Sequence, residues 1–304
     1  MNFKYKNIVF QSIEKLPFGN KMYHLLQKYI TKSIKCNDTE LIGYYKSKVK
    51  CHLDKFKKYG YRPLNQSNYY EFGAGWNLLS VLGMSLAGLK DCICIDLNEL
   101  LEKDAIKESV IFLDRYITKV DKVSLEKIIL SKSKQDIKWG LKKYFRIEYK
   151  APCDARKVGF INDETIDYIA SNVTLEHIPC TDLVSIMKEC YRILNYQGIM
   201  SVTIDYQDHW SYFDCSISVY NFLQFEEKEW EKFNPAMHYQ NRLRHCDYIK
   251  IFEEAGFYIK EVKIKEVCLK DKEDLRKIKI ATCFKKYTFE ELLIRGAHFV
   301  LGKG

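Results

Sequence analysis

The sequence has no apolar run that approaches the roughly 20 residues of a membrane-spanning helix. Its first residues, 1–7, contain neither a long apolar core nor a small-residue cleavage site, so we expect a cytoplasmic protein without a signal peptide. Internal repeats and low-complexity segments are also missing, which argues against a solenoid. What remains is a chain of 304 residues, 47% hydrophobic and 29% charged, that is long enough for one large α/β domain with additions.

Paired cysteine motifs are missing as well, although the chain has 11 cysteines. No two of them form a C-x-x-C pair, and no Cys/His spacing matches a familiar metal site. Cys92 and Cys94 lie two apart in a predicted strand and therefore face the same side. We expect reduced, mostly buried thiols and no metal.

The charge is unbalanced but spread out. The chain has 49 basic and 40 acidic residues, which gives a formal net charge of +9. This excess is typical of solvated helix faces, or of a protein with an anionic substrate. No nucleic-acid-binding module is recognisable, so no nucleic-acid partner is expected. The sequence does not indicate an oligomeric state.

Apolar runs alternate with helical patterns through most of the chain. This order predicts an α/β protein with a Rossmann-like, seven-stranded, mostly parallel sheet that has helices on both faces. The predicted helices after the first strand include 76–88, 181–194 and 246–255. The predicted strands are 68–72, 91–96, 145–150, 166–170, 199–204, 257–266 and 278–287.

The remaining segments predict additions to this sheet. Residues 1–67 resemble an N-terminal helical cap, with apolar residues at helical spacing from Tyr23 to Ile34. The main domain is expected at 68–304. Within it, 98–145 predict a helical insertion and the aromatic, polar stretch 205–244 predicts a substrate lid after strand five.

A glycine-rich turn follows the first predicted strand. Glu71-Phe72-Gly73-Ala74-Gly75 runs directly into a helical pattern, and Asp96 ends the next strand. Strand, glycine turn, helix, strand and acid is how an α/β sheet holds a nucleoside. A dinucleotide site would need a small residue where Leu78 stands, which disfavours a nicotinamide-dependent oxidoreductase.

Later motifs change this interpretation. Cys153-Asp154-Ala155 follows the third strand, Ser171–Ile178 follows the fourth, and a helix that ends at Leu194 leads to Gly198 and the fifth. Together with the glycine turn, these motifs resemble the class I S-adenosylmethionine-dependent methyltransferases over about 68–287. The resemblance implies that the cofactor is S-adenosylmethionine and that the product is S-adenosylhomocysteine.

The resemblance also implies a cofactor site. Gly73 and Gly75 would let the cofactor approach the backbone closely. Glu71 would hold the amino group of the cofactor, Asp96 the ribose hydroxyls and Asp154 the adenine amino group. For the three acids, an ordinary structural or loop role is the alternative. The implied cofactor residues are Glu71, Gly73, Ala74, Gly75, Asp96, Leu97, Asp154, Ala155 and Asn172.

The segment 204–214, with its Asp–x–x–Asp–His–aromatic pattern, resembles methyltransferases associated with surface-polysaccharide and small-molecule pathways. His209 is the expected catalytic base, with Asp208 or Asp205 orienting it, and His177 is a second candidate. A structural role for each histidine is the alternative.

Residues in the predicted lid are expected to bind substrate. Arg242 and Arg244, if extended, would point to one side and clamp a phosphate or carboxylate, whereas a salt bridge to a nearby acid is the alternative. The aromatic residues would either line the substrate site or form the core of the lid. The expected substrate-binding residues are Tyr206, Trp210, Tyr239, Asn241, Arg242 and Arg244.

These observations predict methyl transfer to oxygen on a small anionic or sugar-containing molecule, such as a phosphorylated sugar or a nucleotide-linked one, in surface-glycan biosynthesis. A non-catalytic partner that binds the cofactor and activates another methyltransferase is the alternative.

Overall fold

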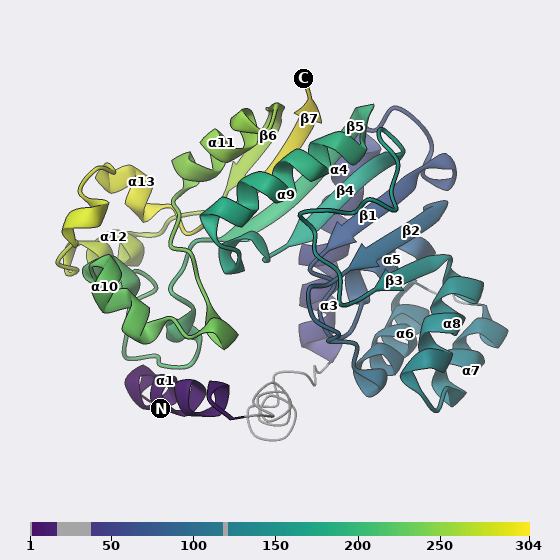
Figure 1. The fold of residues 1–304 in the computed structure, drawn as a ribbon, viewed down its shortest axis with the longest axis horizontal. Helices are drawn as coiled ribbons and strands as arrows, with labels where there is room; N and C mark the ends of the chain where they lie inside the picture. Colours follow the sequence, from purple (N-terminus) through teal and green to yellow (C-terminus); the bar gives the residue numbers. More distant parts are fainter. Residues whose placement is uncertain (1, 17–37, 118–120) are drawn as a thin grey trace.

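The computed structural model describes residues 2–16, 38–117 and 121–304. A seven-stranded sheet runs through the molecule, in the order β3-β2-β1-β4-β5-β7-β6 (Figure 1). The predicted helix from Tyr23 to Ile34 lies outside the described residues. The strands are β1 (Asn68–Phe72), β2 (Asp91–Ile95), β3 (Ile147–Lys150), β4 (Ile166–Asn172), β5 (Leu194–Asp205), β6 (Phe257–Ile264) and β7 (Gly296–Lys303).

Most strand pairs are parallel. β1 to β5 pair only in parallel with one another, whereas β7 lies between β5 and β6 and runs antiparallel to both. The carboxyl ends of the first five strands therefore meet at one edge of the sheet, where α/β proteins bind their ligands. The predicted Rossmann-like, mostly parallel sheet is confirmed.

Helices cover both faces of the sheet. α4 and α5 pack on one face and α9 and α11 on the other, while α6, α7 and α8 extend past β3 (Figure 1). In the described ranges, no helix is long and apolar enough to cross a membrane. The α-helices are α1 (Phe3–Glu14), α3 (Asp38–Tyr45), α4 (Cys51–Tyr59), α5 (Leu79–Leu86), α6 (Lys103–Ile117), α7 (Lys122–Leu130), α8 (Lys134–Phe145), α9 (Cys180–Ile193), α10 (Glu227–Trp230), α11 (His245–Glu254), α12 (Leu269–Arg276) and α13 (Phe289–Leu293).

Alternation along the strands builds two cores. Tyr69 of β1 and Tyr168 of β4 pack under α4 and α5, whereas their neighbours Tyr70 and Ile169 pack under α9 and α11. Successive side chains of a strand point to opposite faces, so a sheet covered on both sides needs apolar residues at nearly every position. This need explains the unbroken apolar runs of the sequence.

The helix α4 is fixed to the sheet by one aromatic stack and one ion-pair cluster. The Phe56 ring stacks on Tyr168 with centroids 4.5 Å apart. At the far edge, Glu261 of β6 pairs with Lys55 and, at 3.0 Å, with Lys58. The part of the predicted N-terminal cap that α4 forms is therefore integral to one face of the sheet.

A third core lies away from the sheet. α1 packs against the predicted lid, where Phe10 contacts Trp210 and the Phe3 backbone N–H donates to Asp214 at 2.8 Å. Residues from 267–293 complete this core, and Figure 1 shows α1, α10, α12 and α13 gathered on one side of the molecule. The domain boundaries themselves stay a prediction.

Two sequence predictions need correction. The strand predicted at 278–287 is wrong: this segment contains a 3-10 turn, η9 (Thr282–Phe284), and its apolar side chains pack into the third core. The last strand is β7, whose residues are largely buried. The helix predicted from residue 76 begins only at Leu79, because Leu78 adopts a left-handed conformation with φ of 52°.

The stack between α4 and β4 yields a stability prediction. Phe56→Ala should lower the free energy of unfolding by about 3–5 kcal/mol, because it leaves a cavity under Tyr168. Urea denaturation measures this loss. Phe160→Ala is the control, since Phe160 is 47% exposed, and should cost about 1 kcal/mol or less. Equal losses for the two variants would contradict the packing described here.

Candidate functional site

The glycine turn after β1 is fixed by β2. The backbone N–H groups of Gly73 and Ala74 both donate to the Ile95 carbonyl, at 3.0 and 3.1 Å. Gly73 has φ of 75°, and a Cβ added there would lie 2.5 Å from the Thr174 side chain. Gly75 has φ of 70°, and a Cβ there would meet nothing within 4 Å. Both positive φ values favour glycine; at Gly73 a side chain would also clash, whereas Gly75 faces open space.

Asp96 ties the end of β2 to this turn. One carboxylate oxygen accepts from the Gly75 N–H at 3.0 Å and the other from the Asn98 N–H at 3.1 Å. Burial raises the pKa of Asp96, and these backbone hydrogen bonds oppose the rise. Leu97 beside it is 64% exposed. The structure thus brings Asp96 and Leu97 next to the predicted glycine turn.

The loop after β3 reaches the same edge. The Cys153 N–H donates to the Asp96 carbonyl at 2.8 Å, which places Asp154 and Ala155 close to the end of β2. Asp154 forms an ion pair of 2.6 Å with Arg156, and this side-chain pairing lowers its pKa. This salt bridge fits the alternative given for Asp154 in the sequence analysis, an ordinary structural role in the loop.

Glu71 and Asn172 face each other below the turn. Glu71 is 2% exposed; its Oε2 accepts from the Tyr69 hydroxyl at 2.8 Å, and its Oε1 lies 3.5 Å from the amide Nδ2 of Asn172. Burial raises the pKa of Glu71 to about 7, although hydrogen bonds to Tyr69, Ser80 and Asn172 oppose this. This carboxyl group therefore titrates near neutral pH.

A row of side chains that sequence reasoning missed continues from Asn172. Asn172 Oδ1 lies 2.8 Å from His52 Nε2, and His52 Nδ1 lies 2.7 Å from Ser201 Oγ. The same Ser201 hydroxyl lies 2.7 Å from His298 Nε2. These contacts join α4, β5 and β7 to the floor of the site. The sequence signal was weak, because His52 lies in a helical segment far from the motifs.

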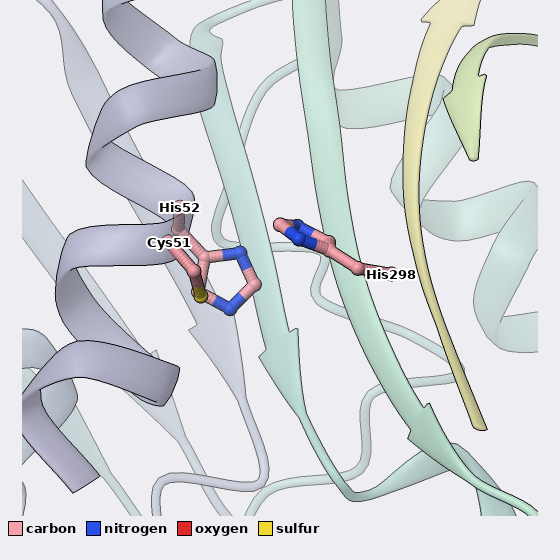
Figure 2. Close-up of side chains that lie close together, drawn as sticks. All are labelled: Cys51, His52 and His298. Carbon is pink, nitrogen blue, oxygen red and sulfur yellow. The ribbon is translucent and has the colours of Figure 1, made fainter. Parts of the chain in front are cut away.

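Figure 2 shows His52 on α4 turned toward His298, with Cys51 beside His52. The donor atoms of this Cys51–His52–His298 group lie within 4.8 Å of one another. All three side chains already form hydrogen bonds within the protein: the two rings to Ser201, and the Cys51 thiol to the Ser47 carbonyl at 2.7 Å. These contacts account for the group without a metal ion.

A second group lies at the carboxyl ends of β4 and β5. Glu176 and His177 form the short turn η4 (Leu175–His177), and His209 begins η5 (His209–Tyr212). Their ligand-type atoms also lie within 4.8 Å of one another. Glu176 links the two strand ends, since its Oε1 accepts from the Asp205 N–H at 3.2 Å. We call these three residues the EHH group.

The environment of the EHH group perturbs each member. Burial and the neighbouring His177 lower the pKa of His209 to about 4, so its ring is neutral at pH 7. Burial also lowers the pKa of His177 and raises that of Glu176 well above its usual range. Asp205 is the acid that faces His209, with Oδ2 at 3.9 Å from Nε2.

Asp208 is placed differently from the sequence prediction. Its carboxylate accepts from the Trp210 backbone N–H and from the Asn221 amide, each at 2.8 Å. It thereby caps η5 from inside the lid. Because both of its oxygens bond there, this geometry favours a structural role for Asp208. Asp205 is the acid beside His209, and its carboxylate also accepts from the Gln207 amide and the Tyr212 hydroxyl.

The two predicted clamp arginines are buried and engaged. Arg242 has φ of 59°, so the segment is not extended; the side chain donates to the carbonyls of Phe222 and Phe225 and pairs with Glu227 at 2.7 Å. Arg244 donates to three carbonyls, those of Tyr206, Leu292 and Ile294. Arg242 thus holds parts of the lid together, and Arg244 ties the lid to the segment before β7. These contacts correct the expectation of two parallel free guanidinium groups.

Most of the other predicted substrate residues also hold the lid together. Trp210 is buried and its indole N–H donates to the Phe233 carbonyl at 2.8 Å. Tyr206 stacks on Tyr248, and Asn241 donates to the backbone after β4. Tyr239 is the exception, because its ring is only half-buried and its carbonyl accepts from His177 Nδ1 at 2.8 Å.

A hollow of about 420 Å³ opens at the opposite edge of the sheet. It lies at the start of β5 and β6, between aromatic side chains that include Tyr59, Tyr196 and Tyr258. None of the predicted cofactor, catalytic or substrate-binding residues lines it. The hollow is therefore separate from the carboxyl edge where Gly73, Asp96 and the EHH group lie.

Comparison with known proteins agrees with this geometry. A family model described as a methyltransferase domain matches residues 71–202. No curated protein matches the chain.

Solved structures share the fold at low sequence identity. A protein from Pyrococcus horikoshii is 12% identical, with 93% of this chain and 99% of that chain covered and a TM-score of 0.50. An S-adenosylmethionine-dependent methyltransferase from Clostridium acetobutylicum is 13% identical, with 94% and 98% covered and a TM-score of 0.47. At such identities the likeness concerns the fold alone.

The matched family segment contains the glycine turn, Asp96 and Asn172, which the structure brings to one edge of the sheet. Residues 71–202 of the chain therefore match a methyltransferase domain.

Proposed function

We propose that the carboxyl edge of β1 to β4 holds S-adenosylmethionine through the residues predicted from the sequence. The fit rests on this structure: the turn at Gly75 faces open space, and a buried carboxyl group, Glu71, lies below it. The proposed cofactor residues are Glu71, Gly73, Ala74, Gly75, Asp96, Leu97, Asp154, Ala155 and Asn172.

Each proposed contact follows from chemistry. Glu71, with Asn172 beside it, binds the amino group of the cofactor, since an ionised carboxylate is an acceptor for an ammonium group. Asp96 accepts from the ribose hydroxyls, and Asp154 accepts from the adenine amino group. When bound, S-adenosylmethionine supplies a methyl group on a positively charged sulfur.

We further propose that the acceptor is an oxygen of a small anionic or sugar-containing molecule, bound beside His177 and His209, in surface-glycan biosynthesis. The observation that carries this is the placement of two imidazoles at the carboxyl ends of β4 and β5, one of them exposed. The net charge of +9 supports an anionic molecule, and the half-buried Tyr239 and exposed Tyr212 are surfaces for a sugar ring.

His209 is positioned to accept the proton of the acceptor hydroxyl. Its Nε2 is buried and has no hydrogen-bond partner among the residues that the structure describes. Its neutral state at pH 7 provides a lone pair, and Asp205 faces the ring. The His209 side chain is buried, which limits the access of water to its ring.

Asp96→Ala should weaken binding of S-adenosylhomocysteine by about 1–3 kcal/mol, because it removes hydrogen bonds to a charged group. Isothermal titration calorimetry measures this. Asp91→Ala is the matched control: Asp91 is at the other end of β2 and pairs with Arg146 on the surface. An unchanged affinity in Asp96→Ala would remove Asp96 from the cofactor site.

Cofactor binding should depend on pH through Glu71. Its pKa of about 7 means that raising the pH through 7 removes the proton and creates the carboxylate that binds an ammonium group. Affinity for S-adenosylhomocysteine should therefore rise by up to about tenfold from roughly pH 6 to 8. Glu71→Gln should bind more weakly and lose this dependence. An identical pH profile in the variant would assign the effect to another group.

His209→Ala should lower the rate of methyl transfer by ~10²–10⁴ and leave S-adenosylhomocysteine affinity unchanged. The rate is measured as formation of S-adenosylhomocysteine with phosphorylated sugars and nucleotide-linked sugars as acceptors. A rate within a few-fold of wild type would return His209 to a structural role. No turnover with any acceptor, despite tight cofactor binding, would support the non-catalytic partner.

A further inference from the structure

We propose that the EHH group, Glu176, His177 and His209, binds one divalent transition-metal ion, for which Zn²⁺ is the natural probe. The inference rests on the proposed function for its acceptor, since the ion would hold the acceptor oxygen. It changes the expectation, drawn from the sequence, that the protein has no metal.

The first observation is a pair of buried atoms without partners. Glu176 is 1% exposed and His209 5% exposed, and neither Glu176 Oε2 nor His209 Nε2 has a hydrogen-bond partner among the described residues. A buried polar atom without a partner is costly and rare in native proteins. Here two such atoms belong to one group whose ligand-type atoms lie within 4.8 Å of one another. A shared cation would satisfy both.

The second observation is the orientation of His177. Its Nδ1 lies 2.8 Å from the Tyr239 carbonyl, which can only accept, so Nδ1 carries the proton and Nε2 keeps its lone pair. Metal-binding histidines are typically oriented by this kind of bond from the other ring nitrogen. Glu176 is oriented in the same way, since its Oε1 accepts from the Asp205 N–H at 3.2 Å and leaves Oε2 free to bind.

The third observation is the ligand set itself. Two imidazoles and one carboxylate, with a further position open, form a common catalytic site for zinc and for other first-row divalent ions. Ligands of tetrahedral zinc lie roughly 3.4 Å apart. Side chains now within 4.8 Å therefore need a shift of about 1 Å, which the exposed His177 ring can make.

The Cys51–His52–His298 group is a poorer site for an ion than the EHH group. Its imidazoles already share Ser201, and the Cys51 thiol donates within its own helix. In that group, an ion would have to displace hydrogen bonds that the protein already makes. In the EHH group it would occupy unused acceptors. The difference makes Cys51→Ser a matched control.

The ion would bind the acceptor oxygen during methyl transfer and assist its deprotonation. An acceptor hydroxyl bound in the open position loses its proton more readily, and Asp205 is the carboxylate next to the group that can take it. The acceptor oxygen then forms a bond to the methyl carbon while the carbon–sulfur bond breaks. The electron pair of that bond stays on sulfur and neutralises its charge. With the ion bound, His209 Nε2 is a ligand and Asp205 takes the proton; without the ion, His209 is the base proposed above.

The test is zinc uptake by the full-length protein after treatment with a chelator. We expect about one ion per chain, measured by elemental analysis after dialysis and by competition with a chromophoric chelator. Zn²⁺ is the appropriate probe, because nitrogen-rich sites bind it more tightly than Mn²⁺ or Fe²⁺. His209→Ala and Glu176→Gln should each weaken binding by at least about 100-fold. Cys51→Ser should bind as wild type does.

Binding of S-adenosylhomocysteine is measured on every variant, which shows that each is folded and tests the cofactor site separately. Wild-type protein that takes up no Zn²⁺ would overturn the proposal. Uptake that survives both EHH substitutions, or that is lost in Cys51→Ser, would overturn it too. Zinc uptake without cofactor binding would instead leave the metal site in place and contradict the proposed function.

Discussion

The site depends on the attachment of the glycine turn to the strand beside it. Two backbone N–H groups, from Gly73 and Ala74, share the Ile95 carbonyl, and Asp96 accepts from the Gly75 N–H. These bonds form only because β1 and β2 are parallel and in register through Phe72 and Ile95. The turn is thus a continuation of sheet pairing. The positions of the neighbouring acids follow from it, because each acid closely follows a strand that the sheet already fixes.

Residues next to strand ends could be predicted from the sequence, and residues held by distant contacts could not. Glu71, Asp96 and Asn172 reach one edge because parallel strands carry them there. No comparable rule of sheet geometry determines where the side chains of the lid lie. Asp208 and His209 are adjacent in the chain, yet one caps η5 and the other joins the EHH group, and that division depends on Asn221 and His177.

Two further errors show the same limit. The segment 278–287 is rich in apolar residues and is predicted as a strand, but a third core is available and its apolar side chains pack there. Arg242 has a left-handed backbone that no sequence pattern signals, and this turns its guanidinium into the lid. Local pattern predicted the sheet well because the sheet is periodic; the third core is assembled from α1, the lid and residues near the C-terminus.

The hydrogen bonds in the row from Asn172 to His298 all run in one direction, from donor to acceptor. The Oδ1 of Asn172 can only accept, so His52 must carry its proton on Nε2, and its Nδ1 must accept from the Ser201 hydroxyl. The Ser201 oxygen in turn receives the N–H of His298. Burial lowers the pKa of His52 to about 3 and that of His298 to about 4, so both rings are neutral at pH 7. Each ring is therefore locked in one tautomer, and every donor along the row points toward Glu71. A continuous row of hydrogen bonds thereby joins a carboxyl group of β1 to an imidazole on β7, three strands away in the sheet.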